Sequence, residues 1–166
     1  GKGLRAEREV VGVANLQFDE SLVLILDKEG LTTADVVSTV ADELRRQGYA
    51  RDSYKQAILD REQQFPTALD VQGLNVAIPH CDPENVERGA ICAAVLKHPV
   101  DWHRMDEPEQ TCPVSLVVML ALNEAHAHLE MLQKVIALIQ DQELTKRIVS
   151  AATPAEAYEL MAPHLL

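Results

Sequence analysis

The chain has 166 residues, 47% of them hydrophobic and 25% charged, a balance typical of one globular domain with a real core. Its formal net charge of -11 argues against a nucleic-acid partner and against an anionic membrane face. Three cysteines (Cys81, Cys92 and Cys112) without a paired framework, and apolar runs too short to span a bilayer, predict a cytoplasmic protein with no direct membrane insertion.

The first half of the chain predicts one strand followed by two helices. Residues 1–17 are charged and unpatterned at their start, and we expect a loose N-terminal segment there, partly left over from expression because the chain does not open on Met. The apolar run 21–26 is typical of a buried strand. A helix is expected over 32–48, with threonines at its N-cap and a glycine at its C-cap, and a second over 53–63.

The second half predicts more strands and then a helical end. Apolar residues that alternate or are rich in β-formers indicate three strands: 74–78, 90–96 and 114–122. Residues 99–113, which contain the only tryptophan, are interpreted as a loop with at most an edge strand. Three helices follow: 124–141, 143–151 and one capped by Thr153, Pro154 and Glu156. The predicted fold class is therefore α/β: a single domain with a central mixed β-sheet flanked by helices.

His80 is the first candidate for chemistry. It directly follows a predicted strand and Pro79, so its side chain stands at the end of a rigid strand, where sites of α/β proteins are usually built. The alternative is a loop histidine that only titrates.

Arg61 is the second candidate. Tyr54, Ile58 and Arg61 fall at i, i+4 and i+7 of the predicted helix, which puts a cation in line with the buried stripe. Such an arginine must either reach solvent, bind an anion or pair with a nearby carboxylate, and the sequence leaves these alternatives open.

His128 is the third candidate. It shares one face of the long predicted helix with Leu132, Val135 and Ile139, whereas His126 lies nearly opposite and should be solvated. A satisfied core histidine and an anion-binding histidine near a helix N-terminus are both compatible with this pattern.

Two histidines and an arginine that converge would form a metal-free phosphoryl site. A neutral imidazole is nucleophilic near physiological pH, and arginine presents a planar fork to phosphoryl oxygens. Catalysis of phosphoryl transfer is mostly positioning and electrostatic stabilisation. A zinc site would need closer Cys or His pairs, a Cys81 nucleophile would need a better placed base, and no glycine-rich phosphate loop is present. We therefore expect no cofactor and no metal.

At these residues the sequence resembles the type 2 enzyme IIA domains of bacterial sugar phosphotransferase systems, the fructose/mannitol superfamily. The resemblance covers about residues 18–166, and it depends on four segments: Arg61–Thr67, Gly73–Cys81, Val114–Ala121 and His128–Leu132. The wording around Phe65-Pro-Thr and Ile78-Pro-His-Cys looks most like the galactitol-type branch, although Gln72 replaces a usually apolar residue.

The resemblance implies a phosphocarrier. His80 would be the phosphoryl acceptor, His128 and Arg61 would be catalytic, and Arg61, Thr67 and His128 would bind the phosphoryl group. The donor would be the histidine phosphocarrier HPr, and the acceptor a cysteine of an enzyme IIB, coupled to galactitol-like sugar or polyol uptake. Two alternatives remain: a regulatory relative whose phosphorylation state controls a target protein, and a binding module that is never phosphorylated.

Overall fold

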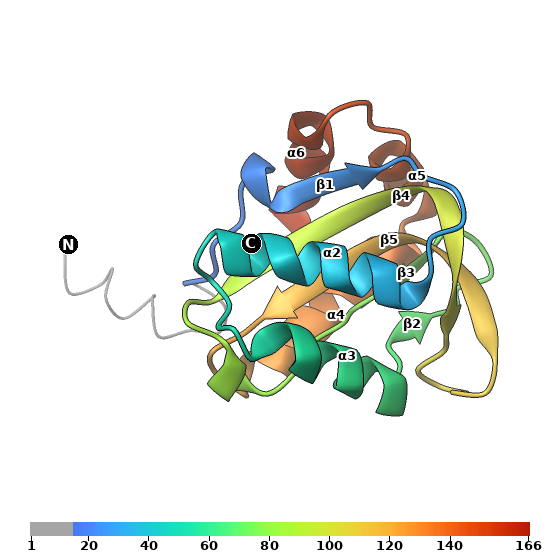
Figure 1. Ribbon diagram of the computed structural model, residues 1–166. Coiled ribbons are helices and arrows are strands. Elements are labelled where there is room, and N and C mark those ends of the chain that lie inside the picture. Colours follow the sequence, from blue (N-terminus) through green and yellow to red (C-terminus); the bar gives the residue numbers. More distant parts are fainter. Residues whose placement is uncertain (1–14) are drawn as a thin grey trace.

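The computed structural model describes residues 15–166 (Figure 1). The expected N-terminal segment 1–17 therefore lies outside the described residues, except for its last three. The strands are β1 (Val23–Leu26), β2 (Ala68–Leu69), β3 (Asn75–Ala77), β4 (Ala90–His103) and β5 (Thr111–Ala121). The helices are α2 (Thr33–Arg46), α3 (Tyr54–Gln64), α4 (Ala127–Gln140), α5 (Gln142–Val149) and α6 (Pro154–Leu165), with short 3₁₀ helices η1 (Glu20–Leu22) and η2 (Pro83–Asn85).

The five strands form one mixed sheet in the order β1-β4-β5-β3-β2. β1 runs parallel to β4, and β3 runs parallel to β5, whereas the β4–β5 and β2–β3 pairs are antiparallel. The expected α/β domain with a central mixed sheet is confirmed. β3 ends beside the middle of the sheet, and this is where the chain continues to His80.

The segment 99–113 was predicted as a loop with at most an edge strand, and this was wrong for both of its ends. β4 continues to His103, and β5 already begins at Thr111, so the two strands form a long hairpin. The ladder shifts register between Val95 and Val100, and this irregularity accommodates Pro99, which lacks an N–H for a regular ladder. Trp102 consequently lies in a strand and is fully buried. The two-residue strand β2 was not predicted, because so short a run has no readable period.

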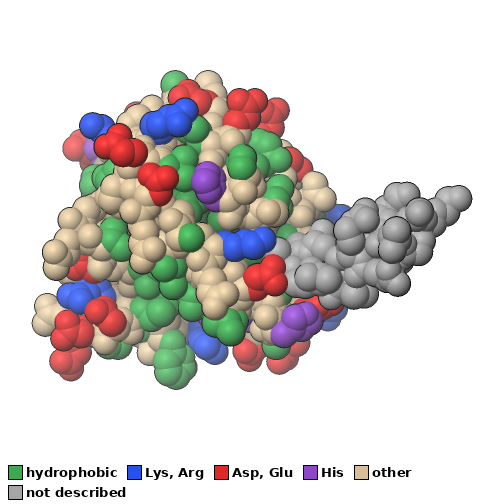
Figure 2. All heavy atoms as spheres, turned by 180° about the vertical axis from the view of Figure 1, so that it is seen from behind, with side chains coloured by type: hydrophobic (Ala, Val, Ile, Leu, Met, Phe, Trp, Pro, Cys, Tyr) green, Lys and Arg blue, Asp and Glu red, His purple; other side chains and the backbone are tan. Residues whose placement is uncertain are grey.

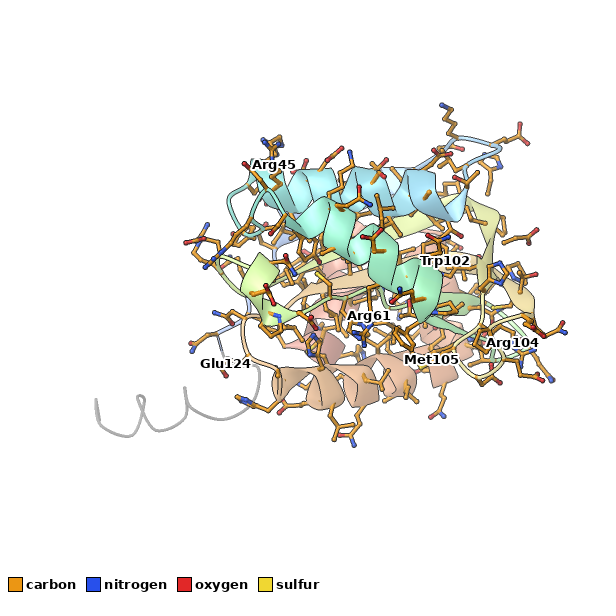
Figure 3. All side chains as sticks on the ribbon, turned by 60° about the horizontal axis from the view of Figure 1, so that its bottom comes forward. Arg45, Arg61, Trp102, Arg104, Met105 and Glu124 are labelled. Carbon is orange, nitrogen blue, oxygen red and sulfur yellow. The ribbon has the colours of Figure 1, made fainter. Side chains whose placement is uncertain are left out.

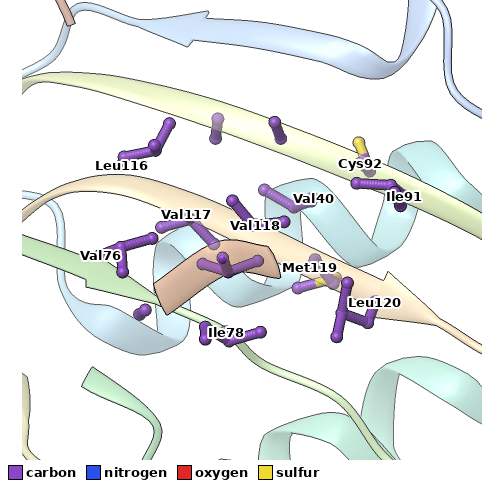
Figure 4. Close-up of a cluster of buried hydrophobic side chains, with 14 of the residues drawn as sticks. Val40, Val76, Ile78, Ile91, Cys92, Leu116, Val117, Val118, Met119 and Leu120 are labelled. Carbon is purple, nitrogen blue, oxygen red and sulfur yellow. The ribbon is translucent and has the colours of Figure 1, made fainter. Parts of the chain in front are cut away.

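Helices cover both faces of the sheet. α2 and α3 lie in front of it in Figure 1, and α4, α5 and α6 lie behind. The core is aliphatic, as the composition predicts. Figure 4 shows a central part of it, where Val40 of α2 packs against β4 and β5. All three cysteines are free thiols and buried, which fits their interpretation as small apolar side chains.

Local signals at helix ends behave largely as predicted. Thr32 and Asp35 form a capping box at α2, and Gly48 follows that helix with φ +86°, a conformation that favours glycine. Thr153 caps α6 by accepting a hydrogen bond from the Glu156 N–H. α4 begins at Ala127 rather than near residue 124, because an i→i−3 turn precedes it and its N-cap residue makes no side-chain cap. No helix within residues 15–166 has the length and apolarity required to cross a membrane.

Candidate functional site

His80 is held in one orientation and one tautomer by the chain that precedes it. Its Nδ1 lies 2.9 Å from the Ile78 carbonyl oxygen, and the Pro79 carbonyl accepts a hydrogen bond from the Leu120 N–H of β5. A carbonyl oxygen only accepts hydrogen bonds, so Nδ1 carries the hydrogen and Nε2 keeps its lone pair. Burial lowers the pKa of His80 below its ordinary value of 6.5, and this keeps the ring neutral and nucleophilic near neutral pH.

His128 faces His80 from the first turn of α4. The two ring centroids are 4.9 Å apart, and the ring planes are inclined by 41°. Both rings line a small pocket of about 100 Å³ whose other walls are apolar: Ile78, Leu120, Leu129 and Leu132. The expected face of the helix is confirmed, since Val135 and Ile139 are buried while His126 is exposed and lies 3.0 Å from Glu124.

The Nε2 atom of His128 has no protein partner in this pocket. It is buried, yet it makes no hydrogen bond to any group within residues 15–166, while Nδ1 lies 3.2 Å from the Ala125 carbonyl oxygen. Burial and the neighbouring His80 lower the pKa of His128. A buried polar atom without a partner is costly, and here it is aimed into the space beside His80. It fits a hydrogen-bonding ligand that arrives from outside.

Arg61 approaches the same site from the last turn of α3. Figure 3 shows it between α3 and α4. Its Nη1 lies 4.0 Å from Asp82 Oδ1, and its guanidinium carbon lies 4.9 Å from the centroid of the Phe65 ring. Its positive field contributes to the lowered pKa of both histidines, after the larger effect of burial. The side chain is 40% exposed, so it can reach an anion in the site without first breaking a buried ion pair.

The sequence pattern predicted that Arg61 lies in the buried stripe of α3, and this prediction was wrong. The buried residues of that helix are Tyr54, Ile58 and Glu62, at i, i+4 and i+8, and Arg61 lies at the edge of this stripe. Glu62 was not predicted as a buried residue, although its four-residue spacing from Ile58 was the available signal.

Glu62 organises a buried polar cluster beneath the site. Its carboxylate accepts hydrogen bonds from the Thr67 N–H at 2.7 Å, from the Thr67 hydroxyl at 2.9 Å and from Trp102 Nε1 at 2.8 Å. Burial raises its pKa, and the three donors oppose that rise. The Thr67 hydroxyl also accepts a hydrogen bond from the Ile78 N–H at 3.1 Å. The cluster therefore fixes the residue whose carbonyl orients the His80 ring.

Thr67 is not brought to the histidine pair by the fold. Its side chain is 2% exposed and does not line the pocket between His80 and His128. Its hydroxyl is already occupied by Glu62 and Ile78. Of the four candidate site residues, His80 and His128 are adjacent, Arg61 is close to both, and Thr67 lies one layer below.

Two other chemistries find little support in this geometry. Burial raises the pKa of Cys81 to about 12, which makes a thiolate nucleophile unfavourable near neutral pH. Within residues 15–166, no three His, Cys, Asp or Glu side chains are grouped so that they could hold a metal ion.

Two further features of the site were not predicted from the sequence. Asp82 lies two residues after His80, and its Oδ1 is 4.0 Å from Nη1 of Arg61. Phe65 and Leu129 are large apolar side chains that are 60% and 64% exposed, beside Arg61 and in the wall of the histidine pocket, respectively. Exposure is decided by how α3 and α4 meet the sheet, so no local pattern signals it.

A neutral imidazole, a second imidazole with an open nitrogen and a nearby guanidinium are thus brought together in one α/β domain. The family model for "Phosphoenolpyruvate-dependent sugar phosphotransferase system, EIIA 2" matches residues 17–163. The chain belongs to this family, whose members are phosphotransferases that carry a phosphohistidine.

Similar proteins agree on the family but not on one sugar. The chain is 31% identical over 142 residues to the fructose-specific EIIABC component of Bacillus subtilis, and the match covers 84% of this chain and 21% of that protein. It is 24% identical over 117 residues to the galactitol-specific EIIA component of Escherichia coli, covering 70% and 77%. The chain thus spans less than a quarter of the length of the EIIABC relatives that it matches.

The fold agrees with that of a solved family member. Enzyme IIA for mannitol from Escherichia coli, in its complex with phosphorylated enzyme IIB, superimposes with a TM-score of 0.72. The superposition covers 89% of this chain and 99% of that one at 21% identity, a level at which the likeness concerns the fold.

Proposed function

We propose that the protein is a cytoplasmic phosphocarrier that accepts a phosphoryl group from phospho-HPr on His80 and passes it to a cysteine of an enzyme IIB. The observation that carries this proposal is the pair of facing imidazoles, with centroids 4.9 Å apart and an open nitrogen on His128. No other place in the described chain combines two facing imidazoles, a buried ring nitrogen without a partner and a nearby arginine.

The tautomer of His80 selects the attacking atom. Nδ1–H donates to the Ile78 carbonyl, so the lone pair of Nε2 forms the new N–P bond. The P–N bond to the donor's imidazole breaks at the same time, and its electron pair returns to that ring, which leaves as a neutral imidazole because its other nitrogen carries a proton. His80 keeps its Nδ1–H and becomes a phosphorylated imidazolium, whose N–H still donates to the Ile78 carbonyl. The hydrogen bond to Ile78 then holds the phosphorylated ring as it held the free one.

Arg61 and His128 supply the positive charge for this transfer. Arginine can grip two phosphoryl oxygens through its planar fork. His128 can donate from Nε2 only as an imidazolium, because its Nδ1–H is engaged by the Ala125 carbonyl. We therefore infer that His128 takes up a proton when the phosphoryl dianion arrives, whose charge reverses the lowering of its pKa. Thr67 contributes indirectly, by anchoring Ile78.

The surface around the site suits a protein partner. Phe65 and Leu129 are exposed on two different elements beside the histidine pair. Acidic side chains are scattered over the face formed by α4, α5 and α6, with apolar ones between them (Figure 2). An apolar centre with a charged rim is typical of protein interfaces, and an acidic domain complements a basic partner such as HPr. The solved enzyme IIA relative forms a complex with phosphorylated enzyme IIB, and we propose the same type of acceptor here.

The transported compound is proposed only as a sugar or polyol. A galactitol-like substrate is compatible with the short segment Ile78-Pro-His-Cys81, but the overall identity to the fructose-specific relative is higher than to the galactitol-specific one.

The test is incubation with enzyme I, HPr and phosphoenolpyruvate, followed by intact mass. The transfer to the domain is then repeated with purified phospho-HPr in excess chelator, because we expect this step to need no metal. We expect one added phosphoryl group, which is acid-labile and base-stable. His80→Ala should abolish it, whereas His126→Ala should not, since His126 is exposed and outside the pocket. Labelling that persists in His80→Ala contradicts the proposal. Labelling without onward transfer to any enzyme IIB from the same genome would favour the regulatory role.

A further inference from the structure

Asp82 stands beside the site without a structural task of its own. It is the N-cap residue of η2, yet its carboxylate makes no capping hydrogen bond. Its side chain is 71% exposed, and its nearest charged partner is Arg61, with Nη1 to Oδ1 at 4.0 Å. An exposed pair at that distance contributes little to folding. We therefore looked for a role of Asp82 in the chemistry of His80, which lies two residues earlier in the chain.

Asp82 and Arg61 act on the two histidines in opposite directions. The pKa of His80 is lowered mainly by burial, raised by the hydrogen bond to the Ile78 carbonyl, lowered by Arg61 and raised by Asp82. At His128, too, Asp82 raises the pKa and Arg61 lowers it. Its carboxylate is thus close enough to be felt at both rings. A group that favours a cation there must disfavour a phosphoryl dianion there, because the field has the same sign for both.

We propose that Asp82 sets the transfer potential of the phosphoryl group on His80. It pairs with Arg61 when His80 is unphosphorylated, and it repels the phosphoryl oxygens when His80 is phosphorylated. This inference rests on the proposed function. The first effect stabilises the domain without its phosphoryl group, and the second destabilises the phosphorylated domain. Both make His80 a weaker acceptor and a better donor, which suits a carrier in the middle of a chain of transfers.

The expected size follows from Coulomb's law at a wet surface. One carboxylate charge acts on a phosphoryl group of about two negative charges across a partly solvated site. At an effective dielectric constant near that of water, this corresponds to a change of about three- to tenfold in an equilibrium constant. Salt should reduce it, since the Debye length is about 8 Å at physiological ionic strength.

The experiment measures how the phosphoryl group is distributed at equilibrium. Purified phospho-HPr is mixed with the domain, and the bound fractions are read by intact mass or ³¹P NMR. In the forward step the N–P bond to HPr breaks as the His80–P bond forms, so the ratio of the two phosphoproteins gives the equilibrium constant directly. We expect Asp82→Asn to shift that constant three- to tenfold toward the phosphorylated domain.

The onward step should shift by the same factor in the opposite direction. The equilibrium constant from phospho-HPr to enzyme IIB is the product of both steps, and it cannot depend on the carrier. Glu84→Gln is the matched control, because it removes the same charge two residues along the chain from an exposed side chain that does not act on His80. Asp82→Glu should restore most of the wild-type constant, which a purely structural role of Asp82 would not require.

The outcomes separate the two levels of the argument. Absence of phosphorylation in the wild-type domain overturns the proposed function itself. Normal phosphorylation with equal constants for Asp82→Asn and Glu84→Gln overturns the role of Asp82 alone. A constant for Asp82→Asn that shifts toward phospho-HPr also overturns it, because Arg61 would then have needed Asp82 for its placement. Melting temperatures of all variants should stay within a few degrees of the wild type.

Discussion

Thr67→Val separates a phosphate-binding role of Thr67 from the supporting role that its contacts indicate. Valine keeps the shape of the side chain and removes only the hydroxyl. The variant loses a 2.9 Å hydrogen bond to the buried Glu62 carboxylate and a 3.1 Å acceptor for the Ile78 N–H. Ile78 retains the Thr67 carbonyl as a second acceptor at 3.3 Å, so its N–H is not left without a partner.

The expected loss is dominated by the bond to the charged group. Hydrogen bonds to charged groups contribute about 1.5–3 kcal/mol, and we expect Thr67→Val to lower the free energy of unfolding by about that amount. Thr67→Ser keeps the hydroxyl and loses one buried methyl group, so it should cost only about 1 kcal/mol. Urea unfolding followed by circular dichroism measures both. The melting temperature should fall by roughly 2–4 °C per kcal/mol in a domain of this size.

The phosphorylation assay completes the comparison. Below their melting temperatures, both variants should accept a phosphoryl group from phospho-HPr within about tenfold of the wild-type rate, because no Thr67 atom reaches the pocket. A Thr67→Val variant of unchanged stability that transfers a hundredfold more slowly would show that the hydroxyl binds phosphoryl oxygen directly. In that case the cluster around Glu62 would have been misinterpreted.

Three further predictions concern the site and its neighbourhood. Arg61→Lys should slow phosphoryl acceptance by about two to three orders of magnitude, as loss of an oxyanion donor does, with little change in melting temperature. His128→Gln should show a milder defect. A large loss of stability with normal transfer in Arg61→Lys would instead make Arg61 a structural partner of Asp82. Burial lowers the pKa of His80 and His128 in the folded protein below 6.5. As the pH falls through 6.5, the unfolded chain therefore binds protons that the folded protein does not yet bind, and the free energy of unfolding should decrease. The His80→Gln/His128→Gln double variant should lose less stability than the wild type between pH 7.5 and 5.5 in paired urea titrations, and equal losses would contradict the lowered pKa values. Gln72 has φ +59°, so Gln72→Gly should raise the free energy of unfolding by roughly 0.5–1 kcal/mol, and a decrease would show that its side chain contributes more than its backbone strain costs.

Elements with a strong local signal were predictable from the sequence. α2 and α6 have N-terminal caps that depend on a few neighbouring residues, and the observed bounds of α2 and α3 and the start of α6 lie close to the predicted ones. The long hairpin of β4 and β5 was not predictable in the same way. Pro99 is a strong local signal against a strand, but the ladder absorbs it in an irregularity that only the pairing with β5 creates.

The features of the candidate site likewise differ in whether local sequence was enough to predict them. The sequence alone determined the residue types: a histidine after a strand and a proline, a second histidine on the apolar side of a helix, and an arginine near a helix end. Periodicity was also enough to separate His128 from His126. These features depend on positions within one element, where a spacing of 3.6 residues translates directly into a direction.

Only the tertiary structure decided which of these residues meet and what each one does. The segment after β3 and the start of α4 bring His80 and His128 to one pocket, the end of α3 places Arg61 near it, and Thr67 is buried outside it. The tautomer of His80 is set locally by the Ile78 carbonyl, but the facing of His80 and His128 and the pairing of Asp82 with Arg61 join segments far apart in the chain. A local pattern cannot encode such contacts, because packing of several elements chooses which polar atoms are satisfied and which are left free for a ligand.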